Sequence, residues 1–177
     1  MSKAKLATVW LDGCSGCHMS FLDIDERLIA LAELADLVYS PLVDNKNFPE
    51  MVDVTLIEGA VSNEDDYEKI LKVRAHTKIL VSLGDCAVTA NVPGMRNPFK
   101  PKALLERAYI ENADENKHIP VKVIPPLREM SVPVHQVVKV DVFVPGCPPS
   151  ADTIFYVLTE LLAGREPDLT GKTRFGA

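Results

Sequence analysis

The sequence predicts an α/β protein with a doubly wound, mostly parallel sheet of about five strands and an irregular proline-rich insertion. Apolar runs rich in β-branched residues alternate with segments whose apolar residues recur at helical spacing, which is typical of a sheet covered by helices. Three of these runs end in a glycine that is closely followed by a cysteine. With 177 residues and a hydrophobic fraction of 47%, the chain can bury the core of one domain.

The first half of the chain alternates between strands and helices. The expected strands are 5–11, 36–43, 52–60 and 78–83. The first helix is expected at 17–31, because one face carries apolar residues at the helical period, namely Phe21, Ile24, Leu28 and Leu31. The second helix is expected to run to about Ala75 from a cap at Ser62 or Asn63, since acidic residues crowd its first turns.

The middle of the chain is interrupted by proline. Ten of the 13 prolines lie between Pro93 and Pro149, so the segment 93–138 is predicted to be an irregular insertion. A short helix is expected at 101–111, and 120–138 is expected to be extended without a firm structure. A loop of this length in a small domain usually lines a site or an interface.

The chain closes with a last strand and a last helix. The strand is expected at 140–144, and Ser150 is expected to cap a helix with an apolar stripe that Gly164 ends. We therefore expect residues 1–164 to form one domain and residues 165–177 to form a polar tail on the surface or on a partner.

Charge and targeting signals limit the function classes. The 19 basic and 25 acidic residues give a net charge of −6, which argues against nucleic acid and an anionic membrane surface as main partners. No apolar run approaches the roughly 20 residues of a membrane span. Because no signal segment is recognisable at the N-terminus, a cytoplasmic location is expected. In that reducing compartment, the four cysteines are more typical of ligands or catalytic thiols than of disulfides.

The four cysteines all follow predicted strands. Cys14 and Cys17 form a Cys-x-x-Cys pair, Cys86 follows Gly84, and Cys147 stands between Gly146 and two prolines. The carboxyl ends of parallel strands form one rim of an open sheet, so three strand ends can bring four thiols together. Thiolates are the usual ligands of iron–sulfur clusters, with four for a cubane. The pattern therefore favours a [4Fe-4S] site.

Two other interpretations of the cysteines stay open from spacing alone. Cys14 and Cys17 could be the redox pair of a thiol–disulfide oxidoreductase, which leaves Cys86 and Cys147 as buried cysteines. The second open interpretation is a zinc-stabilised binding domain, although structural zinc sites more typically show two Cys-x-x-Cys pairs. His18 is interpreted as a residue behind the ligands or on the surface, because neighbouring Cys17 and His18 cannot easily bind the same metal.

The motifs together resemble a known family. Trp10-Leu11-x-Gly13-Cys14-x-Gly16-Cys17-x-x-Ser20, Gly84-x-Cys86 and Val144-Pro145-Gly146-Cys147-Pro148-Pro149 resemble the small subunit of [NiFe]-hydrogenases and the related 20-kDa subunit of respiratory complex I. The resemblance spans about 6–162. Ser15 and Gly16 separate the first two cysteines, which are adjacent in the complex I subunit, and 92–97 resembles the cytoplasmic bidirectional, NAD-reducing hydrogenases.

This resemblance implies a flavodoxin-like domain in which Cys14, Cys17, Cys86 and Cys147 bind one proximal [4Fe-4S] cluster. It also implies that the chain has no catalytic residue of its own. The nickel–iron centre would lie in a hydrogenase large subunit, and FMN and NAD would bind to iron–sulfur diaphorase subunits. A hydrogenase coupled to NADP, F420 or sulfur compounds is the alternative within the class.

Overall fold

The computed structural model describes residues 3–176 and contains a five-stranded parallel sheet. Its strands are β1 (Ala4–Trp10), β2 (Ala35–Tyr39), β3 (Val52–Glu58), β5 (Thr77–Leu83) and β7 (Val142–Val144). They lie in the order β2-β1-β3-β5-β7, and every neighbouring pair is parallel. This is the flavodoxin-like order, and its direction of winding reverses between β1 and β3. The predicted doubly wound sheet is confirmed.

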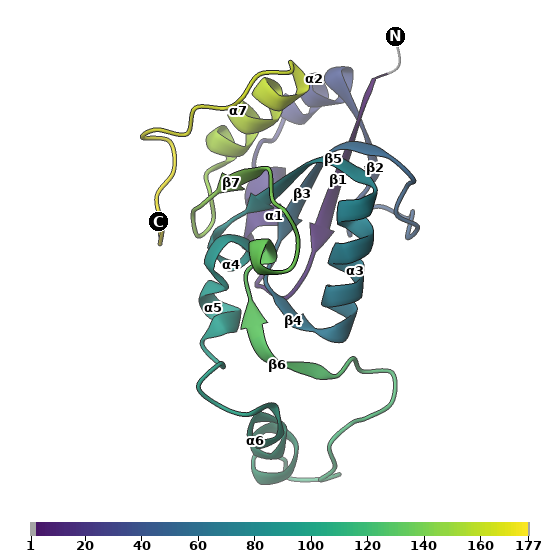
Figure 1. Ribbon diagram of the computed structural model, residues 1–177, viewed down its shortest axis with the longest axis vertical. Coiled ribbons are helices and arrows are strands. Elements are labelled where there is room, and N and C mark those ends of the chain that lie inside the picture. Colours follow the sequence, from purple (N-terminus) through teal and green to yellow (C-terminus); the bar gives the residue numbers. More distant parts are fainter. Residues whose placement is uncertain (1–2, 177) are drawn as a thin grey trace.

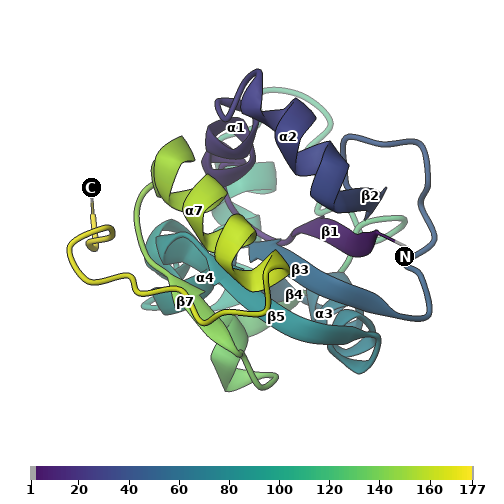
Figure 2. The same cartoon turned by 90° about the horizontal axis from the view of Figure 1, so that it is seen from above.

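Helices cover both faces of the sheet (Figure 2). On one face, α1 (Gly16–Leu22), α2 (Arg27–Leu34) and α7 (Ala151–Leu162) bury a core that includes Phe21, Leu31 and Leu158. On the other face, α3 (Glu64–Ala75) and α4 (Asp85–Thr89) pack against β1, β3 and β5 through residues such as Ile70 and Ala87. The central strands β1, β3 and β5 are mostly buried on both faces, which explains their continuous apolar runs.

The helix expected at 17–31 is two helices. After α1, a turn at 23–26 contains Asp25 with φ of 59°, a left-handed conformation that no α-helix continues through. The single stripe of apolar residues is compatible with this break, since Phe21, Ile24 and Leu31 still enter one core. The turn redirects the chain so that α2 leads directly into the edge strand β2.

The predicted strands 36–43 and 52–60 are shorter in the structure. β2 ends at Tyr39, just before Ser40 and Pro41, and β3 ends at Glu58. Gly59 follows with φ of 92°, where an added Cβ would lie 2.7 Å from the carbonyl oxygen of Asp12. Only glycine fits this close approach, so the chain leaves the sheet here.

Part of the segment without an assigned structure is a strand. β4 (Val61–Asn63) pairs antiparallel with β6 (Leu127–Val132), and the 3₁₀ turn η2 (Val134–Gln136) buries Val134. The side chains of Arg96 and Asn97 both bond to backbone groups of this small sheet. The sequence pattern of β6 is irregular because the strand pairs with a segment 60 or more residues away, not with a local hairpin partner.

The rest of the insertion extends away from the sheet (Figure 1). It contains α5 (Asn91–Gly94), α6 (Pro101–Glu106) and the π-helical turn η1 (Arg107–Glu111). We call residues 99–126 the arm. Val121 is 80% exposed and Val123 is fully exposed, so the arm presents apolar side chains outward. No helix within residues 3–176 is long and apolar enough to cross a membrane.

The predicted caps of the helices α3 and α7 are confirmed. The side chain of Asn63, not that of Ser62, accepts the N–H of Asp66 at the start of α3. The hydroxyl of Ser150 accepts the N–H of Thr153 at the start of α7. Each cap satisfies a backbone donor that the helix leaves free, so these helix starts could be located from sequence.

Candidate metal centre

The four cysteines lie at the carboxyl ends of three strands. Cys14 is in the loop after β1, Cys17 is in the first turn of α1, Cys86 is in α4 after β5, and Cys147 is in the loop between β7 and α7. The structure brings these segments together, since a Cβ on Gly84 would lie 2.2 Å from the sulfur of Cys17 and 3.5 Å from the carbonyl oxygen of Gly146, the residue before Cys147. The sequence predicted this convergence, and the ligand role of the cysteines is taken up as a proposal below.

The group has a buried side and an open side. Cys17 and Cys86 are buried, whereas Cys14 and Cys147 are exposed. A group held by these four sulfurs would be covered by the protein on the Cys17 and Cys86 side and would face outward near Cys14 and Cys147. This arrangement suits a centre that exchanges electrons with another protein.

Burial makes the inner thiols hard to ionise. Burial raises the pKa of Cys17, and the Glu58 carboxylate and the three other thiols raise it further. Burial also raises the pKa of Cys86, although the N–H of Val92 donates to its sulfur and opposes the shift. A cationic partner such as iron would offset these costs, because it favours the thiolate.

Glycines make room for a group among the sulfurs. A Cβ on Gly84, which has φ of 81°, would lie 2.2 Å from the sulfur of Cys17. A Cβ on Gly16 would lie 3.2 Å from the sulfur of Cys14. Gly146 has φ of 140°, and a Cβ there would lie 2.7 Å from the backbone of Pro149. A side chain at Gly84 would displace the sulfur of Cys17, one at Gly16 would crowd the sulfur of Cys14, and one at Gly146 would clash with the loop that carries Cys147. The donor set and the surrounding backbone therefore fit an iron–sulfur cluster.

Hydrogen bonds tie the cysteine-bearing segments to one another. The hydroxyl of Ser20 in α1 donates to the carbonyl oxygen of Pro149 at 2.6 Å. The N–H of Gly84 donates to the carbonyl of Val144 at 2.8 Å. The side-chain amide of Asn91 donates to the sulfur of Cys147 at 3.6 Å. The positions of the thiols are therefore fixed by contacts between segments more than 50 residues apart in sequence.

Sequence reasoning missed Glu58, the buried residue behind Cys17. Because β3 lies between β1 and β5, its last residue sits beneath the cysteine group. The Glu58 carboxylate accepts the N–H of Cys17 at 3.3 Å and the N–H of His18 at 2.9 Å, and it pairs with the ring of His18. In the sequence, the only sign of this role was that Glu58 is a carboxylate residue at the end of a largely apolar strand.

His18 is buried, so its interpretation as a surface residue is wrong and its interpretation as a residue behind the ligands fits. The rings of Trp10 and His18 pack edge to face, with centroids 5.1 Å apart.

Among residues 3–176, no three His, Cys, Asp or Glu side chains lie close enough together to hold a single metal ion.

Comparisons with known proteins agree with this fold. Residues 14–161 match the family described as NADH ubiquinone oxidoreductase, 20 Kd subunit. The chain is 44% identical to the delta subunit of the NAD-reducing hydrogenase HoxS of Cupriavidus necator, over 94% of this chain and 82% of that subunit.

The chain belongs to this 20-kDa subunit family. It is a hydrogenase-type member, since it is also 40% identical to a subunit of the vhu F420-non-reducing hydrogenase of Methanocaldococcus jannaschii. That alignment covers 95% of this chain but 59% of the relative. The present chain also superposes on one chain of the crystal structure of an NAD+-reducing [NiFe]-hydrogenase in the H2-reduced state. The TM-score is 0.93 at 40% identity, with 98% of this chain and 99% of that chain covered.

Proposed function

We propose that this chain is the electron-transfer small subunit of a soluble [NiFe]-hydrogenase and that Cys14, Cys17, Cys86 and Cys147 bind one [4Fe-4S] cluster. The observation that carries the proposal is the convergence of four thiols beside glycines that leave no room for a side chain. All four cysteines of the chain belong to this group, so one cluster is the expected content. Such a cluster takes up and releases single electrons when bound.

The residues of the chain hold and insulate this site. Cys17 and Cys86 bind from the buried side, while the N–H of Val92 and the amide of Asn91 donate to ligand sulfurs and favour the thiolate. Glu58 satisfies the backbone N–H groups of Cys17 and His18, which fixes the turn that carries Cys17. Burial of these groups excludes water from one side of the centre.

We propose that the electrons come from a nickel–iron centre in a hydrogenase large subunit and pass to iron–sulfur and FMN-containing diaphorase subunits that reduce NAD. The 44% identity to a subunit of an NAD-reducing hydrogenase supports this acceptor. A chain with one cluster performs no bond chemistry, so it must lie between a donor and an acceptor subunit. A cytoplasmic location is proposed with it, where thiols remain reduced.

The arm is the proposed contact surface for a partner subunit. Pro101, Tyr109, Ile119 and Ile124 contribute to an apolar groove of about 390 Å³ within it. Val121 and Val123 project from the same segment into solvent. Exposed apolar patches of this kind mark sites of protein association.

A second candidate is a hydrogenase small subunit coupled to a different acceptor. The 40% identity to a subunit of an F420-non-reducing hydrogenase favours it. Partner subunits distinguish the two candidates, so the chain should be purified from its source with its partners. NAD reduction by hydrogen in that complex is expected, and a complex without FMN and without NAD reduction would favour the second candidate.

The thiol–disulfide alternative explains only two of the four cysteines. Cys14 is exposed and accessible, whereas Cys17 is buried. The alternative gives no role to Cys86 and Cys147, although both lie at the same edge of the sheet as the Cys-x-x-Cys pair. The cluster proposal is preferred because it uses all four thiols.

Metal and sulfide analysis of the anaerobically purified chain tests the cluster. About four iron and four sulfide per chain, with an EPR signal after dithionite reduction, are expected. Cys147→Ala is expected to lose most of the iron and to unfold at a lower temperature, because cluster binding is coupled to folding. Zinc, or no metal in a folded anaerobic sample, would refute the cluster assignment.

A further inference from the structure

Asp85 joins three segments that are far apart in sequence. It precedes Cys86, and it is 4% exposed. One carboxylate oxygen accepts the N–H of Gly146 at 2.7 Å, and the other accepts the N–H of Gly176 at 2.6 Å. The N–H of Asp85 donates in return to the carbonyl of Gly146 at 2.9 Å. The side chain therefore connects the Cys86 segment, the Cys147 segment and the end of the described chain.

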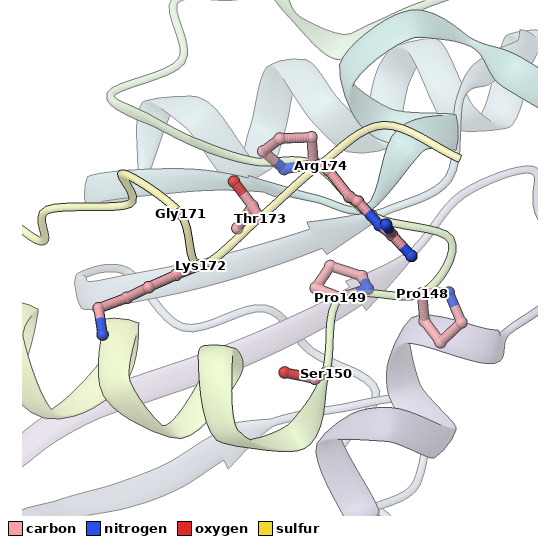
Figure 3. Close-up of a pocket in the computed structure, with 9 residues that line it drawn as sticks. Pro148, Pro149, Ser150, Gly171, Lys172, Thr173 and Arg174 are labelled. Atoms are coloured by element: carbon pink, nitrogen blue, oxygen red, sulfur yellow. The ribbon is translucent and has the colours of Figure 1, made fainter. Parts of the chain in front are cut away.

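Residues 171–176, which we call the C-terminal strap, run alongside the Cys147 loop. The hydroxyl of Thr153 donates to the carbonyl of Lys172 at 2.9 Å, and the Lys172 ammonium lies 4.4 Å from the centre of the Tyr156 ring. Figure 3 shows Thr173 and Arg174 on the strap across from Pro148 and Pro149. Strap and loop line an open pocket of about 430 Å³. The strap thus covers one flank of the loop before it reaches Asp85.

The side chain of Asp85 is buried directly before Cys86. The two hydrogen bonds that it accepts both come from backbone N–H groups, one in the Cys147 loop and one in the C-terminal strap. The contacts therefore hold the two loops and the strap closed over this side of the cysteine group. Solvent exposure is one of the factors that set cluster potentials.

We propose that Asp85 is a positioning residue that clamps the Cys86 and Cys147 loops together, and that the closed clamp keeps the reduction potential of the bound cluster low by limiting its exposure to water. The C-terminal strap completes the clamp and excludes water from the carboxylate. The effect on potential rests on the proposed function, whereas the clamp itself does not require a cluster.

The test compares Asp85→Asn, a deletion of residues 171–177, the combination of both, and Asp152→Asn. Asp152 is the matched control, because its side chain lies on α7 and is 84% exposed. Each protein is purified anaerobically as the full chain, apart from the deletion. Tryptic cleavage after Lys172 and Arg174 is measured in metal-free protein for the variants that keep the strap. Iron release to a chelator and the midpoint potential by EPR-monitored titration are measured for all of them.

Asparagine keeps the shape of aspartate but turns an amide donor toward one of the two backbone N–H groups. We expect Asp85→Asn to be cleaved faster in the strap, to release iron faster, and to have a more positive midpoint potential. The expected change in the one-electron reduction equilibrium is roughly tenfold, or about 59 mV. The strap deletion is expected to shift the potential in the same direction. Adding Asp85→Asn to the deletion should change the potential by less than Asp85→Asn alone, and the control should match the wild type.

Wild-type cleavage, iron release and potential in Asp85→Asn would overturn the proposal. If Asp85→Asn does not fold, the proposal is tested by the strap deletion. Faster iron release and a more positive midpoint potential than in the wild type would support the clamp. Iron release and a potential equal to those of the wild type would overturn it. A wild-type chain without iron and sulfide would refute the proposed function instead. The cleavage comparison on metal-free protein would still decide whether Asp85 holds the strap.

Discussion

Gly84 shows how closely the backbone surrounds the thiols. Its φ of 81° is unfavourable for any residue with a side chain, and its Cα faces the sulfur of Cys17. The same residue donates its N–H to Val144 in the neighbouring segment. Conformation, space and hydrogen bonding therefore all restrict this position to glycine.

Replacing Gly84 by alanine is expected to remove most of the iron and to destabilise the fold. The added Cβ would lie 2.2 Å from the sulfur of Cys17, so the thiol must move. The backbone strain adds about 1–3 kcal/mol. Iron analysis and chemical denaturation measure the two effects.

Gly164→Ala is the matched control for this variant. Gly164 has a similar φ of 72°, but nothing lies within 4 Å of an added Cβ. It should lose stability from strain while keeping its iron. Full iron content in Gly84→Ala would contradict the fit that the glycine positions indicate.

At the scale of elements, the short edge strand β7 carries Cys147 at its carboxyl end and depends on Asp141. The carboxylate of Asp141 accepts the N–H of Leu80 at 2.8 Å and a guanidinium N–H of Arg74 at 2.6 Å. Arg74 also donates to the carbonyls of Thr77 and Lys78. One ion pair thus fastens α3, β5 and the start of β7 together.

The stability contributed by Asp141 is expected to depend on pH. Burial opposes its ionisation, but the N–H of Leu80 and the Arg74 guanidinium outweigh burial and lower the pKa below 3.8. Because the folded-state pKa is lowered, the stabilisation is present above the unfolded pKa and is lost as pH falls through the folded value. Asp141→Asn should therefore cost about 1–3 kcal/mol at pH 7, and the difference from wild type should shrink below pH 3.8.

Urea denaturation at several pH values measures this difference. Asp36→Asn is the control, because Asp36 pairs with Lys3 at 3.8 Å on the surface and should contribute little. A loss of stability in Asp141→Asn that is the same at pH 3 and pH 7 would show that packing, not charge, is responsible.

At the scale of the whole molecule, the arm stands apart from the sheet that holds the cysteines (Figure 1). Its apolar side chains contribute little to the two cores of the sheet, which are formed by the helices on either face. The arm is therefore an apolar surface that the chain does not use for its own cores.

Val121→Asp combined with Val123→Asp is expected to weaken association of the chain with the partner subunit that binds the arm at least tenfold. Two charges would be buried without partners in the complex, and each tenfold loss corresponds to about 1.4 kcal/mol. Co-purification and a binding titration measure the loss, and iron content should stay at the wild-type value. Lys117→Glu on the polar part of the arm is the control. Unchanged association in the double variant would exclude this part of the arm from the interface.

Much of the fold could be predicted because the signals are local. The strands of the parallel sheet appear as apolar runs, and Asn63 and Ser150 mark helix starts by the hydrogen bonds that their own side chains make. The break at Asp25 was not predicted, because a broken helix keeps the same apolar face. β6 was not predicted, because its pairing with β4 depends on residues distant in sequence.

The residue types of the candidate site could be read from the sequence: four cysteines, each near a glycine, at the ends of three predicted strands. Cysteine identity and backbone freedom are properties of single residues, so they can be read without coordinates. Only the tertiary structure decided what surrounds the thiols. Strand order placed Glu58 beneath Cys17, and the return of the chain brought Gly176 to Asp85. These contacts join segments 41 and 91 residues apart, and they form only when the whole sheet is assembled.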